Sequence, residues 1–289
     1  MSEIAAATWV LGTLLDVTAQ AFCEAGVNLL ELSSGEELPN PDLREAGQVD
    51  AVARLQDRLG AEVYCVHSEF RFAWDLASPN PQAREAAVRS HRELLPACAR
   101  LGARHVVVHP GAERDPRLTE EQQLRLSRES LQALAPMAAD LGLRLAVENL
   151  PPTHVGGSLE QMGALLESLD RSVFGFCCDT GHAALAGEGP APYLRAFGDR
   201  LLGVHWQDNR GERDDHLFPG LGSIDWDDCF AALREVNYAL PLTLECLIPA
   251  GWSLRAALDV ARTAGAALRP PLLPAALLAA ASSATPRFS

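Results

Sequence analysis

Short apolar runs rich in β-branched residues alternate along the chain with longer segments in which apolar residues recur at helical spacing. Such runs predict buried strands, and the longer segments predict amphipathic helices. We count eight runs, near Ala7–Leu11, Val27–Leu32, Glu62–His67, His105–His109, Arg144–Glu148, Phe174–Asp179, Leu202–His205 and Leu242–Cys246. Several helical segments end at a glycine shortly before the next run, as Pro81–Leu101 does at Gly102.

Eight strand–helix units in succession predict an α/β fold, the (β/α)8 TIM barrel, with parallel strands inside a ring of helices. The 289 residues fit one barrel, which we expect to span residues 1–268 as a single domain. Residues 269–289 are rich in proline, alanine and leucine and are expected to form a C-terminal appendage. A doubly wound open sheet is the alternative, but it usually carries a glycine-rich phosphate turn after its first strand, which Leu11-Gly12-Thr13 matches poorly.

The basic and acidic residues exclude several classes of protein. All 24 basic residues are arginine, so the chain can form neither a lysine Schiff base nor a lysine-dependent phosphate loop. With 38 acidic residues the formal net charge is −14, which disfavours binding to nucleic acids and to anionic membranes.

The cysteines indicate a reducing compartment. All seven lack C-x-x-C spacing and most lie within apolar runs, so we expect reduced, buried thiols in a cytoplasmic protein. Residues Met1–Ala7 lack the features of a signal peptide, and the longest apolar stretch, Pro271–Ala281, is too short to span a membrane. The sequence leaves the oligomeric state open, with a homo-oligomer among the options.

Side chains that can bind metal ions follow most of the predicted strands. The carboxyl ends of the strands of a TIM barrel form one rim, which carries the active site. Nine groups are expected to converge there: His67, His109, Glu148, Asp179, His182, His205, Asp214, His216 and Glu245. One histidine or glutamate at a strand end is more often a hydrogen-bonded structural residue, but five of the eight histidines fall at these ends or in the adjoining loop.

These groups favour a metal centre. Glu148 and Glu245 each follow an apolar strand, and burying a carboxylate is costly unless a cation or a hydrogen-bond network compensates. A set of imidazoles and carboxylates without thiolate suits zinc, manganese, cobalt or iron. Because nine groups exceed the ligands of one ion, three ions with shared carboxylates, or one to two ions plus histidines that bind substrate, both account for them.

Five segments together carry a family resemblance. They are Val108-His109-Pro110-Gly111, Val147-Glu148-Asn149, Cys178-Asp179-Thr180-Gly181-His182, His205-Trp206-Gln207-Asp208-Asn209, and Asp214–Gly222 running into Ile224-Asp225-Trp226. In this order they resemble the xylose isomerase-like TIM-barrel superfamily, from Thr8 to about Leu268. That superfamily contains sugar and sugar-phosphate isomerases and epimerases together with endonuclease IV, so the resemblance implies a metal-dependent enzyme.

The two branches of the superfamily imply different chemistry. The isomerase and epimerase branch implies one divalent ion, zinc or manganese, on Glu148, Asp179, His205 and Glu245. The two glutamates would move a proton at the carbon next to a carbonyl, and Glu148, Glu245 and His182 are the catalytic residues we expect. The endonuclease IV branch implies three zinc ions on all nine residues, which would clamp a phosphodiester of abasic DNA and activate a water.

The net charge favours the sugar branch. Phosphate contacts to a DNA duplex would rest on Arg71, Arg114, Arg210 and Arg213 alone. We therefore expect an isomerase or epimerase whose partner is a small-molecule sugar or sugar phosphate. A phosphodiesterase is the first alternative, and a non-catalytic barrel is the second, although a dead barrel usually loses ligands that this chain retains.

Residues near the candidate ligands carry further expectations. Glu69, Arg71 and Trp74 follow the third strand and are candidates for substrate recognition, or else part of a solvated loop. Carboxylates commonly orient the imidazoles that bind metals, so Asp208 is expected to orient His205, with a loop cap as the alternative.

Overall fold

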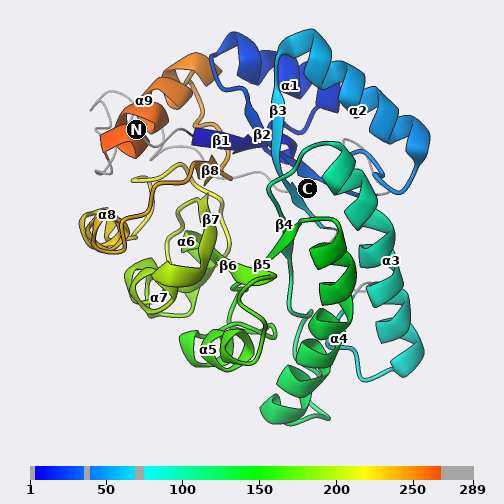
Figure 1. The fold of residues 1–289 in the computed structure, drawn as a ribbon. Helices are drawn as coiled ribbons and strands as arrows, with labels where there is room; N and C mark the ends of the chain where they lie inside the picture. Colours follow the sequence, from blue (N-terminus) through cyan, green and yellow to red (C-terminus); the bar gives the residue numbers. More distant parts are fainter. Residues whose placement is uncertain (1–3, 36–39, 69–74, 268–289) are drawn as a thin grey trace.

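Eight parallel strands close into a barrel at the centre of a ring of helices (Figure 1). The structure is a computed structural model that describes residues 4–35, 40–68 and 75–267. The strands are β1 (Ile4–Ala7), β2 (Leu29–Ser33), β3 (Glu62–His67), β4 (His105–Val108), β5 (Arg144–Glu148), β6 (Phe174–Asp179), β7 (Leu201–Trp206) and β8 (Leu242–Leu244). Each strand pairs with its neighbour in sequence, and β1 pairs with β8. The predicted TIM barrel is therefore confirmed, whereas the expected appendage 269–289 lies outside the described residues.

Helices connect successive strands along the outside of the barrel (Figure 1). They are α1 (Leu15–Glu24), α2 (Ala46–Leu59), α3 (Pro81–Arg100), α4 (Glu120–Asp140), α5 (Leu159–Glu167), α6 (Thr180–Leu185), α7 (Pro190–Phe197), α8 (Trp226–Glu235) and α9 (Leu254–Ala267), with the 3-10 helices η1 (Thr8–Leu11) and η3 (Gly198–Arg200). Local sequence explains several ends. Thr119 and Gln122 form a capping box at the start of α4, and Gly60 ends α2 with a φ of 63°.

The first strand differs from the prediction. We expected it near Ala7–Leu11, but β1 ends at Ala7 and the next four residues form η1. Strand pairing decides the outcome, because β1 lies between β2 and β8 and its register places Ala7 beside Glu31. The stronger intrinsic β preference of Val10 and its neighbours is overridden by this tertiary context. As a consequence, Trp9 lies just beyond the carboxyl end of β1, at the rim.

Apolar side chains fill the barrel on both sides of the sheet. The main core packs the outward side chains of the strands against the helices. Two small clusters lie apart from it, one of Val107, Ala146, Cys177 and Leu202, and one of Ala5, Tyr64 and Cys65. The interior is thus packed, as is usual for this fold, and polar groups concentrate at the strand ends.

The cysteines are reduced, as the sequence predicts. All seven cysteines lie within the described residues, where they are free thiols, and only Cys23 is not fully buried. No helix in the described parts of the chain combines the length and the apolarity that crossing a membrane requires.

Candidate metal centre

The structure brings all nine candidate ligands together at one end of the barrel. Strands β3, β5 and β6 end in His67, Glu148 and Asp179. The other six follow as His109 after β4, His182 in α6, His205 in β7, Asp214 and His216 in the loop after β7, and Glu245 directly after β8. Pairs of side-chain atoms no more than 4.0 Å apart link them into one network.

Glu148 lies at the centre of this network. Its Oε2 is 3.0 Å from His67 Nε2 and 2.9 Å from His109 Nε2, while its Oε1 is 2.9 Å from His205 Nδ1. Burial alone would raise the pKa of Glu148, but the histidines, above all His205 and His109, hold it well below its usual range. Glu148 is therefore an ionised carboxylate whose two oxygens serve different neighbours.

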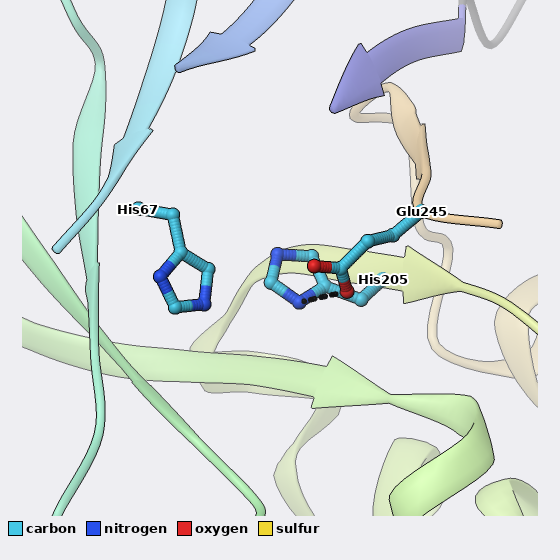
Figure 2. A group of neighbouring side chains, drawn as sticks. All are labelled: His67, His205 and Glu245. Atoms are coloured by element: carbon cyan, nitrogen blue, oxygen red, sulfur yellow. Dashed lines mark ion pairs between the residues drawn. The ribbon is translucent and has the colours of Figure 1, made fainter. Parts of the chain in front are cut away.

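A second carboxylate approaches the same imidazole nitrogen. Glu245 Oε2 is 3.1 Å from His205 Nδ1, and Figure 2 shows these two side chains with His67 nearby. Burial would raise the pKa of Glu245, yet His205 and His216 lower it to about 2. Ligand atoms of Glu148, Asp179, His205 and Glu245 all lie within 4.8 Å of one another, and all four residues are buried.

Asp214 joins two further histidines at the outer side of the network. Its Oδ2 is 3.1 Å from His182 Nε2 and 3.1 Å from His216 Nε2, and Gln207 Nε2 donates to its other oxygen at 2.8 Å. Burial alone would lower the pKa of His216, but Asp214 and Glu245 raise it to about 9. His216 also has a φ of 45°, an uncommon backbone conformation for a residue other than glycine. Such strain is often retained at functional sites.

Two residues at the site were missed by the sequence analysis. Glu31 in β2 is buried, and its Oε2 is 3.0 Å from His205 Nε2. Trp9 in η1 donates from Nε1 to Glu245 Oε1 at 3.0 Å and packs edge-on against His216. The sequence does indicate Glu31, because it is a single carboxylate inside the apolar run Leu29–Leu32. Trp9 was missed because the predicted first strand, Ala7–Leu11, included it.

The expectation for Asp208 was wrong. Asp208 forms no hydrogen bond to His205 among the described residues, and it instead accepts hydrogen bonds from the loop that follows it. The donors are the backbone N–H groups of Asn209, Gly220, Gly222 and Ile224 and the indole N–H of Trp226. Asp208 thus organises the loop that carries Asp214 and His216, which is the loop-cap alternative. The proposed substrate contacts Glu69, Arg71 and Trp74 lie outside the described residues.

The donor set fits a divalent cation. Burial, together with the nearby carboxylates Glu148 and Glu245, raises the pKa of Asp179 to about 7 against the opposing effect of His182. Carboxylates crowded in this way repel one another, and a cation bound among them would remove the repulsion. Three groups can present one ligand atom from each residue: Glu148, Asp179, His205 and Glu245; His67, His109 and Glu148; and His67, His205 and Glu245. Imidazole and carboxylate donors of this kind suit zinc or manganese.

Sequence comparisons find several relatives. An uncharacterised protein of Sinorhizobium fredii is 30% identical over 165 residues, which cover 56% of this chain and 53% of that protein. An inosose dehydratase of Clostridium botulinum is 29% identical over 142 residues, covering 43% and 47% of the two chains. An inosose isomerase of Bacillus subtilis is 23% identical over 176 residues, covering 58% and 63%. The aligned part of this chain thus spans about half to two thirds of these relatives.

Solved structures with the same fold cover nearly the whole chain. A D-tagatose 3-epimerase-like protein superposes with a TM-score of 0.76 at 24% identity, over 89% of this chain and 93% of the other. The IolI protein, solved with a bound zinc atom, gives a TM-score of 0.76 at 18% identity, over 92% and 97%. The profile of the family described as xylose isomerase-like TIM barrel matches residues 20–267. The chain therefore belongs to the xylose isomerase-like TIM-barrel family.

Proposed function

We propose that this protein is a metal-dependent isomerase or epimerase that acts on a small polyhydroxylated ketone. The observation that carries the proposal is the pair Glu148 and Glu245, two buried carboxylates that both contact His205 Nδ1 within a group of four potential ligands. The names of the relatives, inosose isomerase and inosose dehydratase, support a ketone of this class as substrate. Within this class, a sugar phosphate is the least favoured substrate, because the net charge of −14 repels a phosphate group.

Glu148, Asp179, His205 and Glu245 would hold the metal ion, as zinc or manganese. When bound, a divalent cation polarises a carbonyl and stabilises negative charge on the substrate oxygen. The four side chains are buried, so the protein keeps bulk water away from these ligand atoms.

Glu148 and Glu245 would transfer the proton. Both have pKa values below their usual range, so both are ionised and ready to accept a proton from the carbon next to the carbonyl. Trp9 holds Glu245 by its Oε1, and His67 and His109 hold Glu148 by its Oε2, which fixes both carboxylates. One ionised glutamate would remove the proton, and the other, after taking up a proton from water, would deliver it to the opposite face of the same carbon. In an isomerisation, the glutamate that removed the proton would return it to the neighbouring carbon.

His182 would orient the substrate. Its Nδ1 contacts the backbone oxygen of Asn149, and its Nε2 contacts Asp214. Burial alone would lower the pKa of His182, but Asp179 and Asp214 raise it well above its usual value. Both N–H groups of the protonated imidazole are engaged in these contacts, so His182 would donate to a substrate oxygen only when that oxygen takes the place of Asp214 at Nε2.

Exchange of a carbon-bound proton tests the proposal directly. Metal-loaded protein incubated with inosose or D-tagatose in deuterated water is expected to introduce deuterium at the carbon next to the carbonyl, as NMR can detect. Isomerisation and dehydration share this proton removal, so exchange reports either reaction and the product distinguishes them. Absence of exchange from both ketones and from a panel of ketoses, with metal bound, would contradict the proposal.

A phosphodiester hydrolase with several metal ions is the second candidate. It is favoured by five potential ligands beyond the central four, namely His67, His109, His182, Asp214 and His216, which belong to the same network. Multi-metal clamps stabilise the attacking and leaving oxygens of a phosphodiester together. The net charge of −14 opposes binding to a DNA duplex.

Metal content separates the two candidates. Protein purified without chelator is expected to contain about one zinc or manganese ion per chain, because the central four residues suffice for the proposed reaction. Elemental analysis provides the measurement, and removal of the metal by chelator should lower the melting temperature reversibly. About three zinc ions per chain, together with cleavage of an abasic-site duplex, would favour the hydrolase instead.

A further inference from the structure

His205 has a different neighbour at each of its ring nitrogens. Nδ1 faces two potential metal ligands, Glu148 Oε1 at 2.9 Å and Glu245 Oε2 at 3.1 Å. Nε2 points the other way, to Glu31 Oε2 at 3.0 Å. We propose that Glu31 is a positioning residue, which accepts the Nε2 proton of His205 and thereby directs the lone pair of Nδ1 toward the metal ion. This inference rests on the proposed function in that it takes His205 as a metal ligand.

Glu31 reaches His205 across the interior of the barrel. Strand β2 pairs with β1 and β3, whereas β7 pairs with β6 and β8. The pairing of β2 with β3 shifts register between Leu30 and Glu31, so that Glu31 lies beside Cys65. Irregularities of this kind often re-aim a side chain next to an active site. Here the register shift occurs at the residue whose carboxylate enters the site.

The contact atom of Glu31 is fixed from a second side. The thiol of Cys65 donates to the same Oε2 at 3.0 Å, so this oxygen accepts from both the thiol and the imidazole. The other oxygen, Oε1, is buried and has no hydrogen-bond partner among the described residues. An unpartnered buried carboxylate oxygen is costly, and Leu29, on the same face of β2, packs against Ala5, Tyr64 and Cys65, so this face accommodates apolar side chains. Packing alone therefore does not explain a glutamate at position 31.

The hydrogen bond has a defined effect on the imidazole. A metal ion can bind Nδ1 only when the proton of the neutral ring is on Nε2, and an acceptor at Nε2 selects that tautomer. A carboxylate acceptor also makes the ligating nitrogen more basic. Loss of a partner of this kind typically weakens metal binding by about 10–100-fold.

Three variants test the assignment. Glu31→Leu removes the acceptor, and Glu31→Gln keeps an acceptor oxygen but loses the charge. Ser33→Ala is the matched control, because Ser33 is a buried polar residue on the same face of β2 whose hydroxyl has no hydrogen-bond partner in the described parts of the chain. The zinc affinity of each variant is measured by competition with a chromophoric chelator, and the Nε2–H proton of His205 is observed by NMR with and without zinc.

We expect zinc affinity to fall about 10–100-fold in Glu31→Leu and by a smaller factor in Glu31→Gln, with Ser33→Ala unchanged. The Nε2–H signal should lie downfield in the wild-type protein, move upfield in Glu31→Gln, and exchange with water in Glu31→Leu. If Glu31→Leu does not fold, the shift and the affinity of Glu31→Gln still test the assignment.

The inference is overturned if either Glu31 variant keeps the zinc affinity of Ser33→Ala and the wild-type Nε2–H signal. These measurements require no sugar, so they separate the two proposals. A loss of zinc affinity in a protein that never turns over a ketone would overturn only the proposed function. Turnover with unchanged affinity in Glu31→Leu would overturn only the role of Glu31.

Discussion

Replacing Glu148 with glutamine is expected to lower kcat by about 1,000-fold or more, while the barrel stays folded. Glu148 contacts three histidines and belongs to two of the three groups of potential metal ligands. Glutamine has nearly the same shape, but it cannot accept a proton at neutral pH, and its amide N–H would face a histidine donor. The variant thus loses the base and weakens the metal site in one step.

The measurement is steady-state turnover of the ketone identified by deuterium exchange, with circular dichroism to confirm folding. Glu129→Gln is the matched control, because Glu129 lies exposed on α4 and forms an ion pair with Arg125 one helical turn away. That variant should keep wild-type turnover. Full activity of Glu148→Gln would show that the site has been assigned to the wrong residues.

The sequence predicted strands in the middle of the chain most accurately. The bounds predicted for Glu62–His67, Arg144–Glu148 and Phe174–Asp179 are those of β3, β5 and β6. Strands buried on both faces give continuous apolar runs with sharp ends, and these ends are easy to see. Because each of these strands ends in a potential ligand, locating the strand end also located the residue at the rim.

Contacts that cross the barrel could not be predicted in the same way. Asp208 follows His205 by three residues, and strand alternation directs it away from the side of His205. The carboxylate that does reach His205, Glu31, lies 174 residues earlier on a strand that does not pair with β7. Glu31 and His205 are neighbours only because the barrel closes. Proximity along the chain therefore favoured Asp208, which is the wrong partner for His205.

The largest expected effect on stability is that of Asp208→Ala, because this buried carboxylate accepts five hydrogen bonds, four from the following loop and one from Trp226 at the start of α8. Removing it leaves buried N–H donors without an acceptor, which is more costly than the loss of a solvent-exposed hydrogen bond. We expect the free energy of unfolding to fall by about 3–5 kcal/mol, as measured by denaturant unfolding of the metal-free protein.

The loop lies in close contact with Asp208. A side chain at Gly222 would place its Cβ 2.2 Å from Asp208 Oδ1, so the backbone approaches the carboxylate as closely as only glycine permits. Asp225→Ala is the matched control, because Asp225 caps α8 through one backbone N–H and should cost only about 1 kcal/mol. Equal losses in the two variants would contradict the role assigned to Asp208. A much larger loss in Asp208→Ala, accompanied by weaker binding of metal, would mean that the carboxylate holds Asp214 and His216 in place through the loop.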